Sequence, residues 1–351
     1  MELSIASIER WLRTEDELEL QDLWLKANKV RQTEVGEEVH LRGLIEISNY
    51  CSRQCGYCGI NVSNSKIIRY RMSKTEIIEC AHKAKKFGYG TIVLQSGEDY
   101  GIAQKEIVKI IRQIKHETDL AITLSLGERS FADLLAFKKA GADRYLIRFE
   151  TSDKKLFHKI HPPLQNKLSD RIKILYELRS LGYEIGSGVM IGIPGQTYKS
   201  LAEDINLFRV LDLDMIGVGP YILHPETDLA KEYKKPINVD QVPNSESMTY
   251  KVLALTRLVC PTANIPSTTA LATLNKKNGR ELGLSRGANV IMPNITPLKY
   301  RVNYEIYPNK ACLFENAEDC NCCIKNRIEI IGRKVGKGKG ERKSHLKISS
   351  N

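Results

Sequence analysis

The chain has 351 residues, of which 42% are hydrophobic and 27% are charged, and its formal net charge is +11. This suits one large globular domain or two small ones, and the strand-length apolar runs exclude a transmembrane helix. Residues 1–20 mix acidic side chains into a helical period, unlike a signal or transit peptide. With nine cysteines, this predicts a cytoplasmic protein in a reducing compartment.

The positive charge raises nucleic-acid binding as one interpretation. Part of it lies in the last stretch, 333–347, which we interpret as a solvated tail. The chain has no paired Cys/His finger and no aromatic RNP motif, so nucleic acid is not the expected partner. A basic surface can instead steer anionic substrates or an acidic partner protein.

The predicted elements begin with two short amphipathic helices over 4–33, where Trp11, Leu18, Leu23 and Ala27 recur at helical spacing. We interpret these helices as a cap that packs on the main domain.

Eight strand-then-helix units follow the cap, and eight is the number in a closed parallel barrel. The expected strands are 41–47, 91–95, 121–126, 144–150, 183–193, 214–220, 263–268 and 288–293. The expected helices include 73–87, 104–116, 129–139, 167–180, 198–210 and 246–259. We therefore predict an α/β chain with a helical cap at 1–40, a (β/α)8 TIM-type barrel at 41–300 and a C-terminal extension at 301–351. An open doubly wound sheet is the alternative, because Pro266 interrupts the seventh strand.

Polar and glycine-rich clusters follow the predicted strands, at the end of a barrel where active sites lie. These clusters are Cys51 to Cys58, Gln95 to Asp99, Ser125 to Glu128, Arg148 to Thr151, Gly192 to Thr197, His224, and Thr268 with Thr269. We expect all of them to face one cavity.

Three cysteines after the first strand, Cys51, Cys55 and Cys58, have C-x3-C-x2-C spacing. Closely spaced thiolates are ligands of iron–sulfur clusters, and three of them leave one iron of a four-iron cluster open to a small molecule. A zinc site, a disulfide and buried free thiols are the alternatives. Zinc usually takes four ligands, and no second pair lies close by.

Cys312, Cys320 and Cys323 form a second set with C-x7-C-x2-C spacing, to which Cys322 adds a fourth thiol. A second iron–sulfur cluster is one interpretation, and reduced surface cysteines or adventitious metal are the others. Cys80 and Cys260 lie in helical stretches and are expected in the core.

The first cysteine motif and its setting resemble the radical S-adenosylmethionine (SAM) enzymes. The resemblance implies a [4Fe-4S] cluster whose open iron binds SAM and cleaves it to a 5′-deoxyadenosyl radical. Within these enzymes, a narrower resemblance is carried by the segments IVLQSGED, TLSLGE, GADRYLIRFET, GIPGQT, GVGPYILHPET, NIPSTTA and GANVIMPNITP. In these segments the chain is similar to the HydE family of [FeFe]-hydrogenase maturases, and the similarity runs over about residues 40 to 335. HydE resembles biotin synthase in fold.

The resemblance also implies roles for single residues. The expected SAM-site and cofactor residues are Tyr57, Gln95, Ser96, Gly97, Glu98, Thr123, Ser125, Glu150, Arg171, Gly188, Met190, Gly192, Tyr304 and Tyr307. Arg148, Thr268 and Thr269 are the expected catalytic residues, placed to hold an anionic substrate. For Gly97 and Glu98 the alternative is an ordinary turn, for Glu150 a salt bridge to a helix lysine, and for Arg171 a solvated arginine. Phe149 departs from relatives that carry histidine there.

The implied activity is radical attack on a small iron complex that carries carbon monoxide, cyanide and a cysteine-derived ligand. The implied partners are the maturases HydG and HydF and an electron-donor protein, with the chain itself a monomer. The implied second cluster, on Cys312, Cys320 and Cys323, is peripheral and non-catalytic. A mutase of the methylornithine synthase type is the alternative enzyme, and an iron–sulfur scaffold or RNA-binding protein is the alternative of another class.

Overall fold

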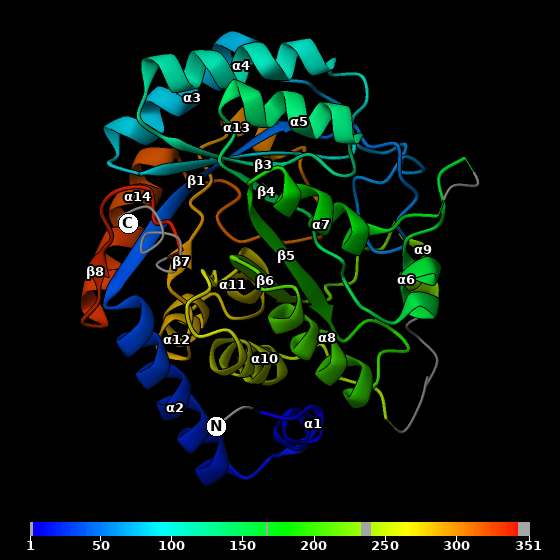
Figure 1. The fold of residues 1–351 in the computed structure, drawn as a ribbon, viewed down its shortest axis with the longest axis vertical. Coiled ribbons are helices and arrows are strands. Elements are labelled where there is room, and N and C mark those ends of the chain that lie inside the picture. Colours follow the sequence, from blue (N-terminus) through cyan, green and yellow to red (C-terminus); the bar gives the residue numbers. More distant parts are fainter. Residues whose placement is uncertain (1–2, 166–167, 233–239, 343–351) are drawn as a thin grey trace.

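The structure, a computed structural model, describes residues 3–165, 168–232 and 240–342. A sheet of parallel strands forms its centre, in the order β6-β5-β4-β3-β2-β1-β7 (Figure 1). The strands are β1 (Glu38–Ser48), β2 (Thr91–Ser96), β3 (Ala121–Ser125), β4 (Arg144–Leu146), β5 (Glu184–Ile191), β6 (Met215–Pro220) and β7 (Val290–Ile291). A short strand that the sequence did not predict, β8 (Lys334–Val335), pairs with the start of β1.

The two outer strands of this sheet are joined through residues 263–268. Asn264 bridges to Met215 of β6, and Pro266 bridges to Val290 of β7, both in parallel. The prediction of a regular strand at 263–268 is therefore wrong, because Pro266 has no N–H to donate to a neighbouring strand. The backbone of this segment nevertheless lies between β6 and β7, where the seventh barrel strand was expected. The (β/α)8 architecture is confirmed in this form.

Helices surround the strands. They are α3 (Lys74–Lys86), α4 (Gln104–Glu117), α5 (Phe131–Ala140), α6 (Lys154–Ile160), α7 (Arg171–Ser180), α8 (Tyr198–Val210), α9 (Asp228–Glu232), α10 (Glu246–Val259), α11 (Thr269–Leu274), α12 (Gly279–Ser285), α13 (Leu298–Arg301) and α14 (Ala317–Ile330). The predicted cap consists of α1 (Ile5–Arg13) and α2 (Glu17–Val35), which pack on α8 and α10 respectively. No helix in the described part of the chain is long and apolar enough to cross a membrane.

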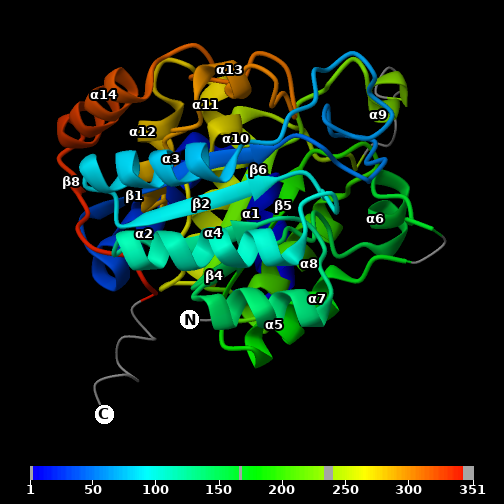
Figure 2. The ribbon, with the colours of Figure 1, turned by 90° about the horizontal axis from the view of Figure 1, so that it is seen from above.

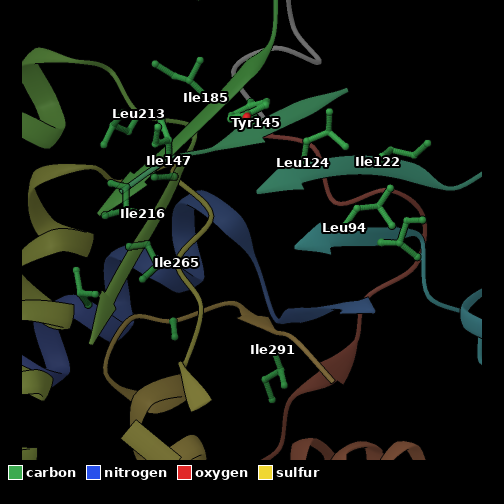
Figure 3. Packing of buried hydrophobic residues seen from close by; sticks show 14 of the residues in the cluster. Leu94, Ile122, Leu124, Tyr145, Ile147, Ile185, Leu213, Ile216, Ile265 and Ile291 are labelled. Atoms are coloured by element: carbon green, nitrogen blue, oxygen red, sulfur yellow. The ribbon is translucent and has the colours of Figure 1, made fainter. Parts of the chain in front are cut away.

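Alternation along the strands separates the core from the barrel interior. Ile122 and Leu124 of β3 belong to the buried core shown in Figure 3. Thr123 and Ser125, which point to the opposite face of the same strand, line an interior cavity instead. The sequence pattern of apolar and polar residues thus decides which side chains can reach a ligand.

Several predicted elements are shorter than expected. The strand predicted at 288–293 is only β7 (Val290–Ile291), and the strand predicted at 183–193 is β5 (Glu184–Ile191). β4 ends at Leu146 instead of continuing to Glu150, which adopts φ 60° and bridges to Val189 of β5. The predicted helix 167–180 begins only at Arg171, with Asp170 as its N-cap. Residues 166–167 lie outside the described residues.

The basic C-terminal stretch is not a solvated tail over residues 333–342. The Lys339 carbonyl accepts hydrogen bonds from Thr91 Oγ1 (2.7 Å) and from the buried Arg144 Nη2 (3.2 Å). The Gly340 carbonyl accepts from Arg42 Nη2 at 3.0 Å. These donors lie at the amino ends of the strands, so the segment closes that end of the barrel. Residues 343–347 of the predicted tail lie outside the described residues.

Gly90 provides a test of this closure, because a Cβ added there would meet the Gly338 carbonyl oxygen at 1.7 Å. We expect Gly90→Ala to displace residues 336–340 and to lower the free energy of unfolding by roughly 2 kcal/mol. Denaturant unfolding and limited proteolysis would measure the effect. In a chain ending at Val335 the same substitution should have little further effect, whereas an equal loss in both chains would contradict the closure.

Candidate active site

A cavity of about 350 Å³ lies inside the barrel, and its lining includes the cysteine loop at the carboxyl ends of the strands. Predicted site residues that line it are Cys51, Cys55, Tyr57, Cys58, Gln95, Ser96, Glu98, Thr123, Ser125, Arg148, Glu150, Arg171, Met190, Thr268, Thr269, Tyr304 and Tyr307. Gly97, Gly188 and Gly192 do not line it. Gly97 lies against the cysteine loop, since a Cβ there would meet the Tyr50 carbonyl oxygen at 2.2 Å.

The cysteine loop after β1 is fixed by hydrogen bonds to its backbone carbonyls. Arg69 donates to the carbonyls of Asn49 (2.6 Å), Ile60 (2.7 Å) and Asn61 (2.6 Å). On the other side, Gly56 N–H donates to the carbonyl of Ile160 at the end of α6. Figure 2 shows this loop, in blue, close to α9 on the side of the molecule away from β8.

The three thiols of the loop are largely removed from water. Cys55 is buried, and Cys51 and Cys58 are half-buried. Desolvation, with a smaller contribution from the neighbouring cysteines, raises the pKa of Cys58 to about 12 and that of Cys55 well above its ordinary value. Thiols in such surroundings become thiolates only with a compensating positive charge, which a bound metal supplies.

This donor set fits an iron–sulfur cluster. All three sulfurs line one cavity, and no fourth cysteine of the described residues lines it. Within the described part of the chain, no three His, Cys, Asp or Glu side chains gather around one metal-ion position, which gives no support to a mononuclear zinc site. A cluster distributes its ligands over several irons and does not need that convergence.

A buried ion network behind the loop was missed by the sequence reasoning. Arg53 Nε lies 2.6 Å from Glu98 Oε1, and Arg53 Nη2 lies 2.8 Å from Glu128 Oε2. Arg171 Nε lies 3.2 Å from Glu128 Oε1. Burial raises the pKa of Glu128, but the contacts with His161, Arg171 and Arg53 outweigh it and lower that pKa to about 2. These ion pairs join the ends of β1, β2 and β3 to α7.

Arg148 and Glu150 form an ion pair at the cavity wall, with Nη2 3.0 Å from Oε2. Glu150 therefore pairs with Arg148 and not with a helix lysine. Burial raises the pKa of Glu150, against the lowering effect of Arg148 and Arg171. The buried Arg148 Nε and Thr123 Oγ1 have no hydrogen-bond partner among the described residues, so both can bind a ligand.

Glu46 and Lys310 form a second buried ion pair on the cavity wall. Asn294 Nδ2 donates to the other carboxylate oxygen of Glu46, and the ammonium of Lys310 lies 5.2 Å from the Tyr304 ring centre. The sequence held one signal for this pair, because an acidic residue inside the apolar strand LIEIS requires a buried partner. Nothing in the sequence pointed to Lys310 as that partner.

The C-terminal cysteines lie away from the cavity. Cys312 is half-buried and hydrogen-bonded to the buried Cys320, whereas Cys322 and Cys323 on α14 are exposed. The structure therefore brings Cys312 and Cys320 together but leaves Cys323 at the surface. Cys80 and Cys260 are buried, as predicted.

Comparison with known proteins identifies the family. Residues 45–208 match the radical SAM superfamily. The chain is 44% identical over 321 residues to the [FeFe] hydrogenase maturase subunit HydE of Thermotoga maritima, covering 92% of this chain and 88% of that protein. The chain belongs to the HydE family. It is a radical SAM enzyme, and the family carries a [4Fe-4S] cluster and SAM.

Two other relatives place the HydE-family chain in a wider group. It is 30% identical to 3-methylornithine synthase of Methanosarcina acetivorans, over 94% of this chain and 90% of that protein. The crystal structure of methylornithine synthase superposes with a TM-score of 0.81 at 26% identity, over 99% of this chain and 97% of that one. A structure of HydG, with a TM-score of 0.70 and 20% identity over 83% and 65% of the two chains, shows the shared fold alone.

Asp204 of α8 is a further residue that the sequence reasoning missed. It is fully buried, and its Oδ1 accepts from Ser152 N–H at 2.5 Å, which holds the turn directly after Glu150. Its Oδ2 is buried without a hydrogen-bond partner in the described residues. Burial raises the pKa of Asp204 from 3.8 to about 7, in spite of the hydrogen bonds from Ser152 and Thr151.

This shift predicts a pH dependence of stability. Folded Asp204 keeps its proton up to about pH 7, whereas the unfolded chain loses it near pH 3.8. The contribution of Asp204 to the free energy of unfolding is therefore fully present below about pH 4. This contribution, up to about 4 kcal/mol, is lost as the pH rises through 7. We expect Asp204→Asn to flatten the fall in unfolding free energy between pH 5 and pH 8, as measured by denaturant titration. Asp204→Ala, which removes the hydrogen bonds, should lower stability at every pH, and an unchanged slope in Asp204→Asn would contradict the assignment.

Proposed function

We propose that this protein helps to build the active site of an [FeFe]-hydrogenase, as a radical SAM enzyme acting on a small iron complex inside the barrel. The observation that carries the proposal is a cavity with one buried and two half-buried thiols on its wall and unpaired donors at Arg148 and Thr123. The 44% identity to the HydE subunit supports the same activity. In this proposal the complex carries carbon monoxide, cyanide and a cysteine-derived ligand.

Cys51, Cys55 and Cys58 would hold a [4Fe-4S] cluster and leave one iron for SAM. When bound, the cluster supplies the electron that cleaves SAM to a 5′-deoxyadenosyl radical, the species that attacks the substrate. The chain's own contribution is to exclude water from the reaction, because the barrel is closed at its amino end by residues 336–340.

The SAM contacts follow from the cavity lining. Three of the five N–H groups of Arg171 contact Glu128, the Arg148 carbonyl and His161, so the others remain for the SAM carboxylate. The remaining proposed contacts that line the cavity are Ser96 and Glu98 for the amine, Glu150 for the amine or ribose, and Tyr57 and Met190 for the adenine. Gly97 for the amine and Gly188 and Gly192 for the adenine are proposed from the family resemblance alone, because they do not line the cavity. Gln95, Thr123, Ser125, Tyr304 and Tyr307 complete the proposed lining.

Arg148, Thr268 and Thr269 are the proposed substrate residues. The guanidinium of Arg148 attracts an anionic complex and has an unpaired Nε–H to donate. Thr268 Oγ1 accepts from Leu271 N–H at the start of α11, which leaves its hydroxyl proton free to bind a ligand.

We expect Arg148→Ala to lower substrate conversion by about 10²-fold or more, because the substrate loses its position relative to the radical. SAM should still bind. Calorimetric titration with SAM and anaerobic product analysis would measure the two effects separately. Arg148→Lys keeps the positive charge but not the paired N–H donors of the guanidinium. Its substrate conversion should therefore lie between that of the wild type and that of Arg148→Ala. Unaltered turnover in Arg148→Ala would refute the assignment.

The cluster assignment has its own test. Reduced, reconstituted protein should produce 5′-deoxyadenosine from SAM, and Cys58→Ala should abolish that production. The matched control is Cys322→Ala, which removes an exposed thiol. Wild-type protein that binds iron but leaves SAM intact would favour the iron–sulfur scaffold alternative, and salt-sensitive RNA binding would favour the RNA-binding one.

The second candidate is a mutase of the methylornithine synthase type, which the 30% identity and the TM-score of 0.81 favour. The two enzymes share the barrel and the cysteine loop. Anaerobic assays with amino acids separate them, because 3-methylornithine among the products would identify the mutase.

Other parts of the proposal concern partners. HydG would supply the complex, HydF would receive the product, and an electron-donor protein would reduce the cluster, with this chain a cytoplasmic monomer. The accessory cluster on Cys312, Cys320 and Cys323 stays a prediction. Its support is partial, because Cys312 and Cys320 are adjacent while Cys323 is exposed. Iron analysis of a variant lacking all three thiols tests it.

A further inference from the structure

His161 is a buried histidine beside the cysteine loop that the sequence analysis did not single out. It is the C-cap residue of α6, its side chain is 0% exposed, and Pro162 follows it and prevents the helix from continuing. Its ring packs on Phe157, with ring centres 5.0 Å apart. The adjacent Ile160 carbonyl accepts from Gly56 N–H at 2.9 Å, which fixes α6 to the loop.

The imidazole contacts a cysteine sulfur through Nδ1 and charged groups mainly through Nε2, although Arg171 Nη2 also lies 3.5 Å from Nδ1. Nδ1 lies 3.0 Å from Cys55 Sγ. Nε2 lies 3.3 Å from Arg171 Nη2 and 3.3 Å from Glu128 Oε1. His161 therefore connects Cys55 to the arginine that lines the cavity.

The partners determine which nitrogen carries the proton once Cys55 is a metal-bound thiolate. A thiolate can only accept, so Nδ1 must donate to it. Arginine can only donate, so Nε2 accepts from Arg171. The Glu128 carboxylate is meanwhile satisfied by Ser169, Arg53 and Arg171. One neutral tautomer thus satisfies the ring on both sides. In this tautomer Nε2 carries no proton, so its 3.3 Å contact with Glu128 Oε1 is not a hydrogen bond, and the pKa of Glu128 is lowered by Arg171, Ser169 and Arg53 without His161.

We propose that His161 is a positioning residue that donates a hydrogen bond from Nδ1 to Cys55 Sγ and raises the reduction potential of the cluster. The inference rests on the cluster assignment made under the proposed function. A hydrogen bond to a ligand sulfur withdraws negative charge from it and stabilises the reduced, more negative state of the cluster. Because Arg171 orients the same ring, the SAM side of the cavity and the cluster ligand share one chain of hydrogen bonds.

Redox titration of the reconstituted protein without SAM, followed by electron paramagnetic resonance, tests the proposal. His161→Leu removes the donor and keeps an apolar side chain of similar reach, so the midpoint potential should become more negative. His161→Asn places an amide nitrogen close to the position of Nδ1 and should restore the potential to near that of the wild type. An unchanged potential in His161→Leu, or equal shifts in both variants, would overturn the proposal.

His224 offers a matched control. It is also buried against the loop, beside Gly59, and its Nδ1 accepts from Glu226 N–H at 3.2 Å. Contrary to the expectation from the sequence, His224 does not line the cavity. We expect His224→Leu to leave the potential unchanged, and a shift equal to that of His161→Leu would assign both effects to loop packing and overturn the proposal.

Iron analysis separates loss of the cluster from a change of its potential. If His161→Leu holds no iron, the midpoint potentials of His161→Asn and His161→Gln are compared instead. Asparagine keeps a donor near Nδ1, whereas glutamine places its amide near Nε2 and away from Cys55. A more negative potential in His161→Gln alone supports the proposal, and equal potentials refute it. A wild-type protein without iron at Cys51, Cys55 and Cys58 would refute the proposed function itself, whereas unchanged potentials refute only the role of His161.

Discussion

Removal of three thiols from water is the constraint on which the site depends. Buried thiols keep their protons unless a positive charge compensates, so the loop is suited to hold metal and unsuited to remain empty as thiolates. The loop is correspondingly rigid. On one side Arg69 donates hydrogen bonds to backbone carbonyls of the loop. On the other side the Ile160 carbonyl, at the end of α6, accepts a hydrogen bond from the Gly56 N–H of the loop. The remaining polar residues of the barrel are arranged around this fixed point.

Several charged side chains inside the barrel form buried ion pairs. Arg53, Glu98 and Glu128 form one network and Glu46 with Lys310 another, and each carboxylate has additional hydrogen-bond donors. A buried ion is tolerated only under these conditions, because its desolvation must be offset by several partners. Among the described residues that line the cavity, the buried nitrogen and hydroxyl groups without a hydrogen-bond partner are Arg148 Nε, Thr123 Oγ1, Arg42 Nε and Arg53 Nη1, which a ligand could satisfy.

The two ends of the barrel have opposite properties. The carboxyl end holds the cysteine loop and the network of Arg53, Glu98 and Glu128, whereas the amino end is closed by the backbone of residues 336–340. Glycine is required there, since a side chain at Gly90 would occupy the position of the Gly338 carbonyl. Arg42 contacts both regions, because it lines the cavity and donates to Gly340.

The sequence by itself determined the barrel and the cysteine loop, because strand periodicity and residue spacing along the chain are local properties. Most of the cavity lining came from the resemblance to the HydE family. The sequence reasoning did not identify His161, Asp204 or Lys310, and it misjudged the C-terminal stretch as solvated. Each of these residues acts through a partner distant in sequence: Cys55, Ser152, Glu46, and for the stretch Thr91, Arg144 and Arg42. Only the tertiary structure decided those pairings, since burial and hydrogen bonding depend on which segments meet in space.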